Sequence, residues 1–126
     1  MMGKWWHKLI IESDDLSMLI PEIHHLDSPV YPKSEYDAFY ETPLMETLNN
    51  SGSKDLIVTG VMTHLCVETT VRSAFVRGFR SFLPVNGTAT YNEAHHRASL
   101  LNLSHGFAVT ATIESIIDSI NEDSNA

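Results

Sequence analysis

The stretch that decides the fold is TGVMTHLCVETTVRSAFVRGF, residues 59–79. It begins inside an apolar, β-branched segment, residues 55–61, which is typical of a parallel strand covered on both faces. From Thr63, a residue type suited to the N-cap, a helix is expected to run to about Arg77, and Gly78 is placed to end it. The apolar stripe of this helix would consist of Val67, Val71, Ala74 and Phe75.

The rest of the chain continues this alternation of strand and helix. The sequence predicts a helix over 42–51, a strand over 79–85, a helix over 91–105, a strand over 107–109 and a helix after Thr112. The positions at helical spacing are Ala94, Ala98, Leu101 and His105 in the first of the two later helices, and Ile113, Ile116, Ile117 and Ile120 in the last. Strands that alternate with helices favour right-handed crossovers, and we therefore expect an α/β fold with a parallel sheet.

Length and composition restrict the class of protein. The chain has 126 residues, which we interpret as a single domain over 1–126, with 43% apolar and 19% charged residues. A net charge of −8 argues against a nucleic-acid partner, because phosphate binding requires a basic surface. No apolar run approaches the roughly 20 residues of a membrane span, and no secretory signal is recognisable. A single cysteine cannot form an internal disulfide, so a cytoplasmic location is expected.

The only cysteine, Cys66, follows the end of a predicted strand and lies in the first turn of a predicted helix. The positive end of the helix dipole favours a thiolate, and the unpaired N–H groups of that turn could receive an oxyanion. The alternative is a structural role, because unpaired cysteines commonly behave as small buried hydrophobic residues. Position alone leaves both interpretations open.

Residues 55–79 resemble the signature of the isochorismatase-like cysteine hydrolases, a family that includes nicotinamidases, N-carbamoylsarcosine amidase and ureidoacrylate amidohydrolase. The signature is an apolar strand, then Gly-Val-x-Thr-x-x-Cys-Val, then a Thr-x-x-x-Ala helix that ends in Gly-Phe. Residues 33–44, KSEYDAFYETPL, and residues 84–103, PVNGTATYNEAHHRASLLNL, are similar to two further segments of the family. The resemblance implies a three-layer α-β-α, Rossmann-like fold.

The resemblance also implies a catalytic pair. Cys66 would be the nucleophile, and Lys33 would be the cation that stabilises its thiolate or assists proton transfer. The alternative for Lys33 is an ordinary solvated surface lysine. A cis peptide bond at Val61–Met62 is implied as well, and the backbone N–H groups of Met62 and Cys66 would then form the oxyanion hole.

Two aromatic residues of the second segment, Tyr36 and Phe39, are candidates for lining the substrate pocket, with plain core packing as the equal alternative. A cysteine at position 66 points to amide-type substrates, namely carboxamide, carbamoyl or ureido compounds cleaved through an acyl-enzyme. The implied partners are a small-molecule substrate and further copies of the chain, without nucleic acid, membrane or cofactor. No metal site is expected, because neighbouring residues in the pairs His24-His25 and His95-His96 point in different directions on a helix.

The resemblance is incomplete at one end. The family's general base, an Asp at the end of its first strand, has no match at Asp14, Asp15, Asp27 or Asp37, and Asn86 stands where the family often has Asp. We therefore expect the chain to match the C-terminal two-thirds of the family domain and to show low or no activity by itself. The alternative functions are a non-catalytic remnant that serves as a binding or assembly subunit and, less favoured, a thiol redox module, for which a second cysteine is missing.

Overall fold

The computed structural model describes residues 2–24 and 27–124, and the chain divides into two compact units, Met1–Val30 and Tyr31–Ala126. The described part of the first unit contains only short helical turns and no buried residue. These turns are α1 (Met2–Trp5), the 3₁₀ turn η1 (Asp15–Ser17) and α2 (Pro21–His24). The interpretation of residues 1–126 as a single domain stays a prediction.

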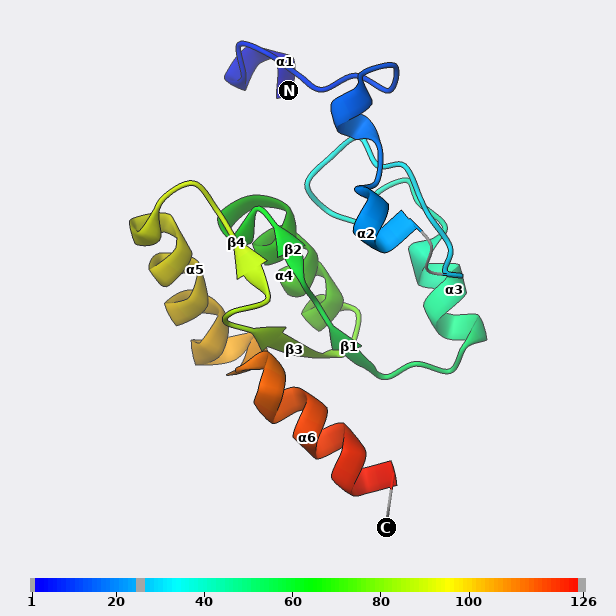
Figure 1. Cartoon of the computed structure of the whole chain (residues 1–126), viewed down its shortest axis with the longest axis vertical. Coiled ribbons are helices and arrows are strands. Elements are labelled where there is room, and N and C mark those ends of the chain that lie inside the picture. The colour runs from blue at the N-terminus through cyan, green and yellow to red at the C-terminus, as the bar shows by residue number, and fades with distance from the viewer. Residues whose placement is uncertain (1, 25–26, 125–126) are drawn as a thin grey trace. The chain divides into compact units, whose positions relative to one another are not determined.

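The second unit carries the sheet and the longer helices (Figure 1). Its strands are β1 (Asp55–Ile57), β2 (Gly60–Val61), β3 (Arg80–Pro84), β4 (Thr88–Ala89) and β5 (Ala108–Ala111). Its helical elements are α3 (Leu44–Asn50), the π-turn η2 (Thr63–Val67), α4 (Glu68–Val76), α5 (Glu93–Gly106) and α6 (Ile113–Ser124).

Strands β1, β3 and β5 form a parallel sheet in the order β1-β3-β5. The predicted α/β class with a parallel sheet is therefore confirmed. The predicted strand over 55–61 is divided, because its second part, β2, pairs with β4 in a separate two-stranded parallel sheet. Gly60 stands at the division with φ +108, a value that glycine adopts without steric cost, and its N–H donates to the Gly87 carbonyl at 3.0 Å.

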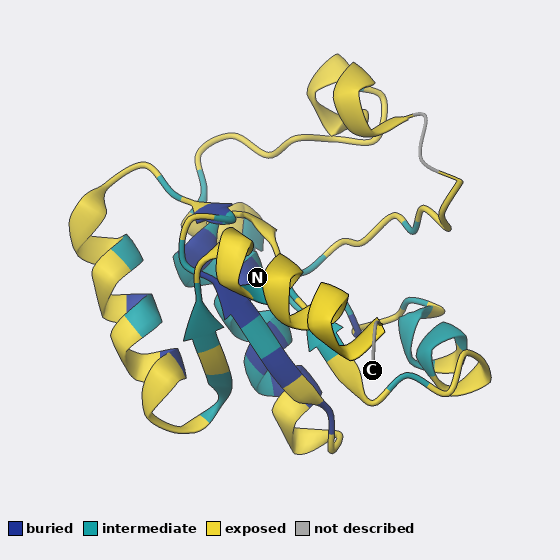
Figure 2. Ribbon diagram, turned by 60° about the horizontal axis from the view of Figure 1, so that its bottom comes forward, coloured by how far each residue is buried: buried dark blue, intermediate teal, exposed yellow. Residues whose placement is uncertain are grey.

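Helices α4 and α5 cover one face of the three-stranded sheet. The centre of this core consists of Val67, Val71, Leu83 and Leu103, with Val58, Leu100, Phe107 and Ala108 packed around it. Figure 2 shows that burial is concentrated along β3 and α4. Leu83 and Leu103 are 0% exposed, so this contact between strand and helix excludes water completely.

A second cluster joins α3, α4 and the segment before α3. It consists of Phe39, Ala74 and Phe79, with Leu44, Met45, Leu48 and Leu56 packed against them. Gly78, with φ +86, ends α4 and turns the chain toward β3, as the sequence predicted.

Three local predictions were wrong. The buried residues of α5 are Ser99 and Leu103, whereas Leu101 of the predicted stripe is 72% exposed. Phe75 is half exposed instead of completing the stripe of α4. Thr63 is no N-cap, because Met62 occupies that position and the Thr63 hydroxyl bonds elsewhere. Contacts with residues distant in sequence account for two of these differences, because Phe75 meets Phe107 edge-on and the Thr63 hydroxyl bonds to His96.

Helix α6 has an apolar stripe at the spacing expected from the sequence, yet none of its described residues is buried. Its Ile117 and Ile120 are each about half exposed. Among the described residues, no helix is long and apolar enough to cross a membrane.

Candidate active site

Cys66 lies in the π-turn η2, directly after β2, and is half-buried. The π geometry is shown by the bond from the Val67 N–H to the Met62 carbonyl, five residues back, at 3.3 Å. Such turns hold one more residue than an α-helical turn and occur often at functional sites. The sequence predicted the place of Cys66 between strand and helix correctly, but it gave no signal for the wider turn.

Lys33 and Cys66 are 33 positions apart in the sequence and meet in the structure. The Lys33 Nζ atom donates to the Cys66 Sγ atom at 3.3 Å and to the Glu35 carbonyl at 2.8 Å. Lys33 is exposed, so the pair is reachable from solvent. The contact joins a cationic side-chain type to the single sulfur nucleophile of the chain. The structure thus brings together the two residues that the resemblance paired.

The segment that carries Lys33 is held against α4 by side-chain hydrogen bonds. The Thr70 hydroxyl accepts from the Ala38 N–H at 3.1 Å and donates to the Tyr36 carbonyl at 3.4 Å. The Ser73 hydroxyl donates to the Asp37 carboxylate at 2.6 Å. The sequence predicted no such contact for either hydroxyl, although two hydroxyl residues beside the apolar stripe of a helix are a usable signal for such contacts.

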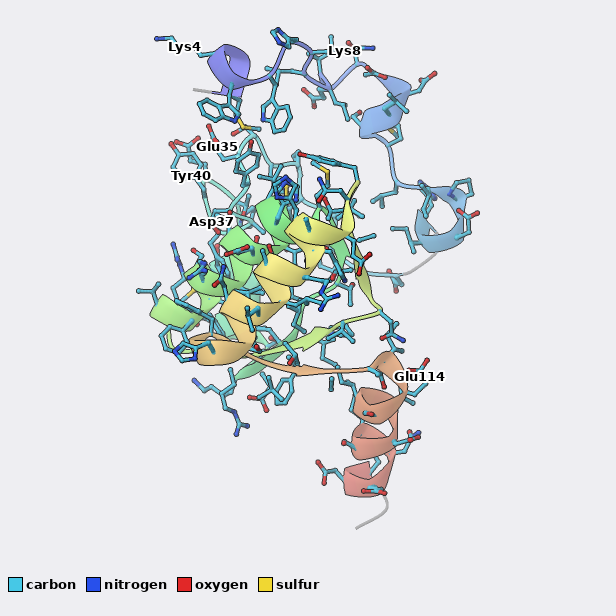
Figure 3. The ribbon with its side chains drawn as sticks, turned by 90° about the vertical axis from the view of Figure 1, so that its left-hand side faces the viewer. Lys4, Lys8, Glu35, Asp37, Tyr40 and Glu114 are labelled. Carbon is cyan, nitrogen blue, oxygen red and sulfur yellow. The ribbon has the colours of Figure 1, made fainter. Side chains whose placement is uncertain are left out.

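Tyr36 and Phe39 are placed differently. Tyr36 borders a shallow depression together with Glu35, Asp37, Tyr40 and Thr69; the labelled members Glu35, Asp37 and Tyr40 gather beside α4 in Figure 3. Phe39 is 7% exposed and stacks on Phe79 with ring centroids 6.0 Å apart. Phe39 thus occupies the core, the alternative that the sequence left open. A pocket-lining role for either residue stays a prediction.

The backbone around Met62 matches one implied feature. The Val61–Met62 peptide bond is cis, as the resemblance implies. The Met62 carbonyl accepts from the N–H groups of Leu65, at 3.1 Å, and of Val67. The role of the Met62 and Cys66 N–H groups as an oxyanion hole stays a prediction.

A cluster of rings lies next to the Cys66 turn. His64 stacks in parallel on His95 with centroids 4.4 Å apart, and Tyr91 stands edge-on to both rings. The Nδ1 atom of His64 is 2.9 Å from the Thr90 hydroxyl. Desolvation by burial is the largest cause that lowers the pKa of His64, and the charge of the neighbouring His95 is the second. The Glu68 carboxylate acts in the opposite direction and raises this pKa. The lowered pKa favours the neutral imidazole of His64 at neutral pH.

Within residues 2–24 and 27–124, no group of three or more His, Cys, Asp or Glu side chains is arranged to hold a metal ion. The ion pairs of this part of the chain are Arg72–Glu68, Arg80–Asp55 and Arg97–Glu93, and none of them includes Lys33. The Asp37 carboxylate, near Lys33 in sequence, is engaged by Ser73 and by the Phe39 N–H.

Comparison with known proteins agrees with this geometry. Residues 3–115 match the isochorismatase domain. The chain is 45% identical to nicotinamidase 3 of Arabidopsis thaliana over 112 aligned residues, with 86% of this chain and 57% of that protein covered. It is 30% identical to the ureidoacrylate amidohydrolase RutB of Enterobacter sp. (strain 638) over 131 aligned residues, with 98% of this chain and 50% of that protein covered. The chain thus spans about half the length of these curated relatives.

Solved structures show the same relationship. An isochorismatase-like hydrolase from Alkaliphilus metalliredigens superposes with a TM-score of 0.77 at 28% identity, over 81% of this chain and 56% of the other. The nicotinamidase from Staphylococcus aureus superposes with a TM-score of 0.60 at 30% identity, over 61% of this chain and 50% of the other. By sequence match and by fold, the chain belongs to the isochorismatase family of hydrolases.

Proposed function

We propose that this chain carries the nucleophile and the cationic partner of a cysteine hydrolase that cleaves a small amide, carbamoyl or ureido compound. The observation that carries the proposal is the 3.3 Å contact between Lys33 Nζ and Cys66 Sγ. A surface lysine without function gains little by holding its ammonium against a sulfur atom, because the ordering of a long side chain costs entropy. The half-buried position of the thiol suits a nucleophile that small molecules can reach.

The proposed reaction has two stages. The Cys66 thiolate attacks the carbonyl carbon, a C–S bond forms, and the carbonyl oxygen becomes an oxyanion that the Met62 and Cys66 N–H groups would receive. The C–N bond then breaks, and the nitrogen leaves with a proton as ammonia or an amine, with the Lys33 ammonium as the nearest proton donor. Water adds to the thioester and returns a proton to the Lys33 amine, the C–S bond breaks, and the carboxylate leaves while the thiolate and the ammonium are restored.

The relatives narrow the substrate class. Nicotinamidase 3, at 45% identity, is named for an aromatic carboxamide, and the amidohydrolase at 30% identity is named for a ureido acid. A carboxamide substrate is therefore the first choice and a ureido compound the second. We also propose a cytoplasmic, homo-oligomeric protein that requires no cofactor. Sedimentation velocity at two protein concentrations tests the oligomeric state.

A decisive experiment combines thiol labelling with turnover. Because Cys66 is the only cysteine, the rate of alkylation by iodoacetamide reports on this thiol alone. We expect alkylation below pH 8 to exceed that of glutathione, and Lys33→Met to slow it several-fold. Lys54→Met is the matched control, because Lys54 is exposed and its known contact is the backbone bond from the Arg80 N–H to its carbonyl.

The alkylation rate separates the two candidate functions, and turnover tests whether any hydrolysis depends on Cys66. Ammonia release from nicotinamide and from a ureido acid should be low or absent for this chain, since no carboxylate forms an ion pair with Lys33 within the described residues. Any release should be abolished by Cys66→Ala. Slow alkylation together with no turnover on either substrate would favour the second candidate, a non-catalytic binding or assembly subunit, which the half-length match also supports.

A further inference from the structure

His96, on the inner side of α5, joins two elements that lie far from it in sequence. Its Nδ1 atom is 2.9 Å from the hydroxyl oxygen of Thr63, and its Nε2 atom is 3.2 Å from the carbonyl oxygen of Val85. Thr63 is 0% exposed and is the first residue of the π-turn that holds Cys66. The catalytic chemistry proposed above makes no use of His96 or of the Thr63 hydroxyl.

The chemistry of the partners decides the direction of both bonds. A carbonyl oxygen only accepts, so the Nε2 atom of His96 carries the proton and donates to Val85. In the neutral ring Nδ1 is then an acceptor, and the hydroxyl of Thr63 must donate to it. Since Thr63 is fully buried, its hydroxyl has no water to turn to, and loss of this bond leaves a buried polar group unsatisfied.

The hydrogen bond from the Thr63 hydroxyl to His96 bears on the register of the Cys66 turn, that is, on which residues the turn includes. The Thr63 carbonyl accepts from the N–H of Glu68, five residues ahead, so Thr63 is the fixed end of the widened turn. A turn that relaxed to α geometry would shift by one residue, and each residue rotates an α-helix by roughly 100°. Such a rotation would swing the Cys66 sulfur away from Lys33.

We propose that His96 is a positioning residue, which holds the buried hydroxyl of Thr63 and thereby keeps the Cys66 turn in the register that faces Lys33. The inference rests on the proposed function in one respect, namely that the contact between Cys66 and Lys33 is the reactive one. It assigns His96 no contact with substrate.

Two pairs of variants separate this role from general stabilisation. An Asn side chain places its amide near the position of the histidine Nδ1 atom, whereas Gln reaches the position of Nε2. His96→Asn therefore preserves an acceptor for Thr63, and His96→Gln preserves only the donor to Val85. Thr63→Ser keeps the hydroxyl, and Thr63→Val removes it with little change of volume. His105→Gln, at an exposed position of the same helix, is the control.

The readout is the rate of Cys66 alkylation by iodoacetamide from pH 6 to 9, on protein shown to be folded by near-UV circular dichroism. Loss of one hydrogen bond corresponds to about a fivefold change in an equilibrium, so His96→Gln and Thr63→Val should slow alkylation below pH 8 by about that factor. Both variants should also need a higher pH than the native chain to reach the same rate of alkylation. His96→Asn and Thr63→Ser should recover most of the rate, and the control should match the native chain.

A double-mutant cycle with Lys33→Met tests the route of the effect. If His96 acts through the contact of Cys66 with Lys33, His96→Gln should add almost nothing in the Lys33→Met background. An equal slowing in both backgrounds, or native alkylation by folded His96→Gln and Thr63→Val, overturns the proposal. If the His96 variants do not fold, the Thr63 pair carries the same comparison. Low or absent amide turnover is expected for this chain and does not bear on this inference, whereas amide release that persists in Cys66→Ala would count against the proposed function and leave this inference intact.

Discussion

The two faces of the three-stranded sheet differ sharply in burial, although their residues alternate along the same strands. On the face toward α4 and α5, Ser81 and Leu83 are 2% and 0% exposed. On the opposite face, Ile57, Phe82 and Val109 stand in one register across the three strands, and Ile57 and Val109 are 49% and 56% exposed.

The contrast shows that apolar residues on both sides of a strand do not by themselves tell which face is covered. Residues 55–61 contain apolar side chains on both sides, which is typical of a strand covered on both faces. Among the described residues only one face is covered, and both residues of the candidate catalytic pair belong to the unit that contains this covered core. We infer that the stability of the unit depends mainly on the face of the sheet that carries Leu83. The predictions below compare the contributions of the two faces to the free energy of unfolding.

The largest effect is expected in the covered core. Leu103→Ala should lower the free energy of unfolding by about 2–5 kcal/mol, because it leaves a cavity at a fully buried position. Leu101→Ala, two residues away on the same helix at 72% exposure, should change it by less than about 0.5 kcal/mol. Urea unfolding measures both. Equal losses would mean that α5 packs with a different face.

A moderate effect is expected where the segment of Lys33 is held to α4. Ser73→Ala removes the hydroxyl that donates to the Asp37 carboxylate and should cost about 1–3 kcal/mol of unfolding free energy. It should also slow the alkylation of Cys66, since Lys33 lies on that segment. Ser104→Ala, whose hydroxyl donates to a carbonyl on the exposed side of α5, is the control. A change in stability without a change in alkylation would show that this anchor does not position Lys33.

A smaller effect is expected in the pH dependence of the melting temperature. The pKa of His64 is lowered in the folded state, so below about pH 6.5 the unfolded state binds more protons and stability falls as the pH decreases. His64→Asn should remove this slope.

The pKa of Glu114, at the start of α6 (Figure 3), is lowered by its own backbone N–H and by Asn86 and Thr112. The contribution of Glu114 is therefore complete above its unfolded pKa of about 4.5 and is lost only as the pH falls through its lower folded value. Glu114→Gln should leave the slope near pH 6 unchanged and flatten only the slope below about pH 4.5. Identical profiles for His64→Asn and the native chain between pH 7 and 5 would contradict the assignment of that slope to His64.

The smallest effect is expected on the open face. Val109→Thr, at 56% exposure, should change the unfolding free energy by less than about 0.5 kcal/mol. The measurement is urea unfolding at two protein concentrations. A loss above about 2 kcal/mol that depends on concentration would show that another copy of the chain covers this face in solution.

The sequence by itself determined the α/β class, the alternation of strand and helix from residue 55 onward apart from the separate strands β2 and β4, the end of α4 at Gly78 and the place of Cys66 after a strand. These features depend on residues a few positions apart, through periodicity, capping and the conformational freedom of glycine. The pairing of Cys66 with Lys33 was also foreseen, but only through a resemblance in motif.

The tertiary structure alone decided which residues meet across long separations. It selected Ser99 and Leu103 over Leu101 as the buried side of α5, and it gave the Thr63 hydroxyl to His96 instead of to the helix start. It also left the face of the sheet that carries Ile57 and Val109 half open. The physical reason is that α5 offers apolar residues on more than one side, so its own periodicity does not choose between them. That choice is made by the elements that pack against it, among them η2, α4 and β3, which come earlier in the chain.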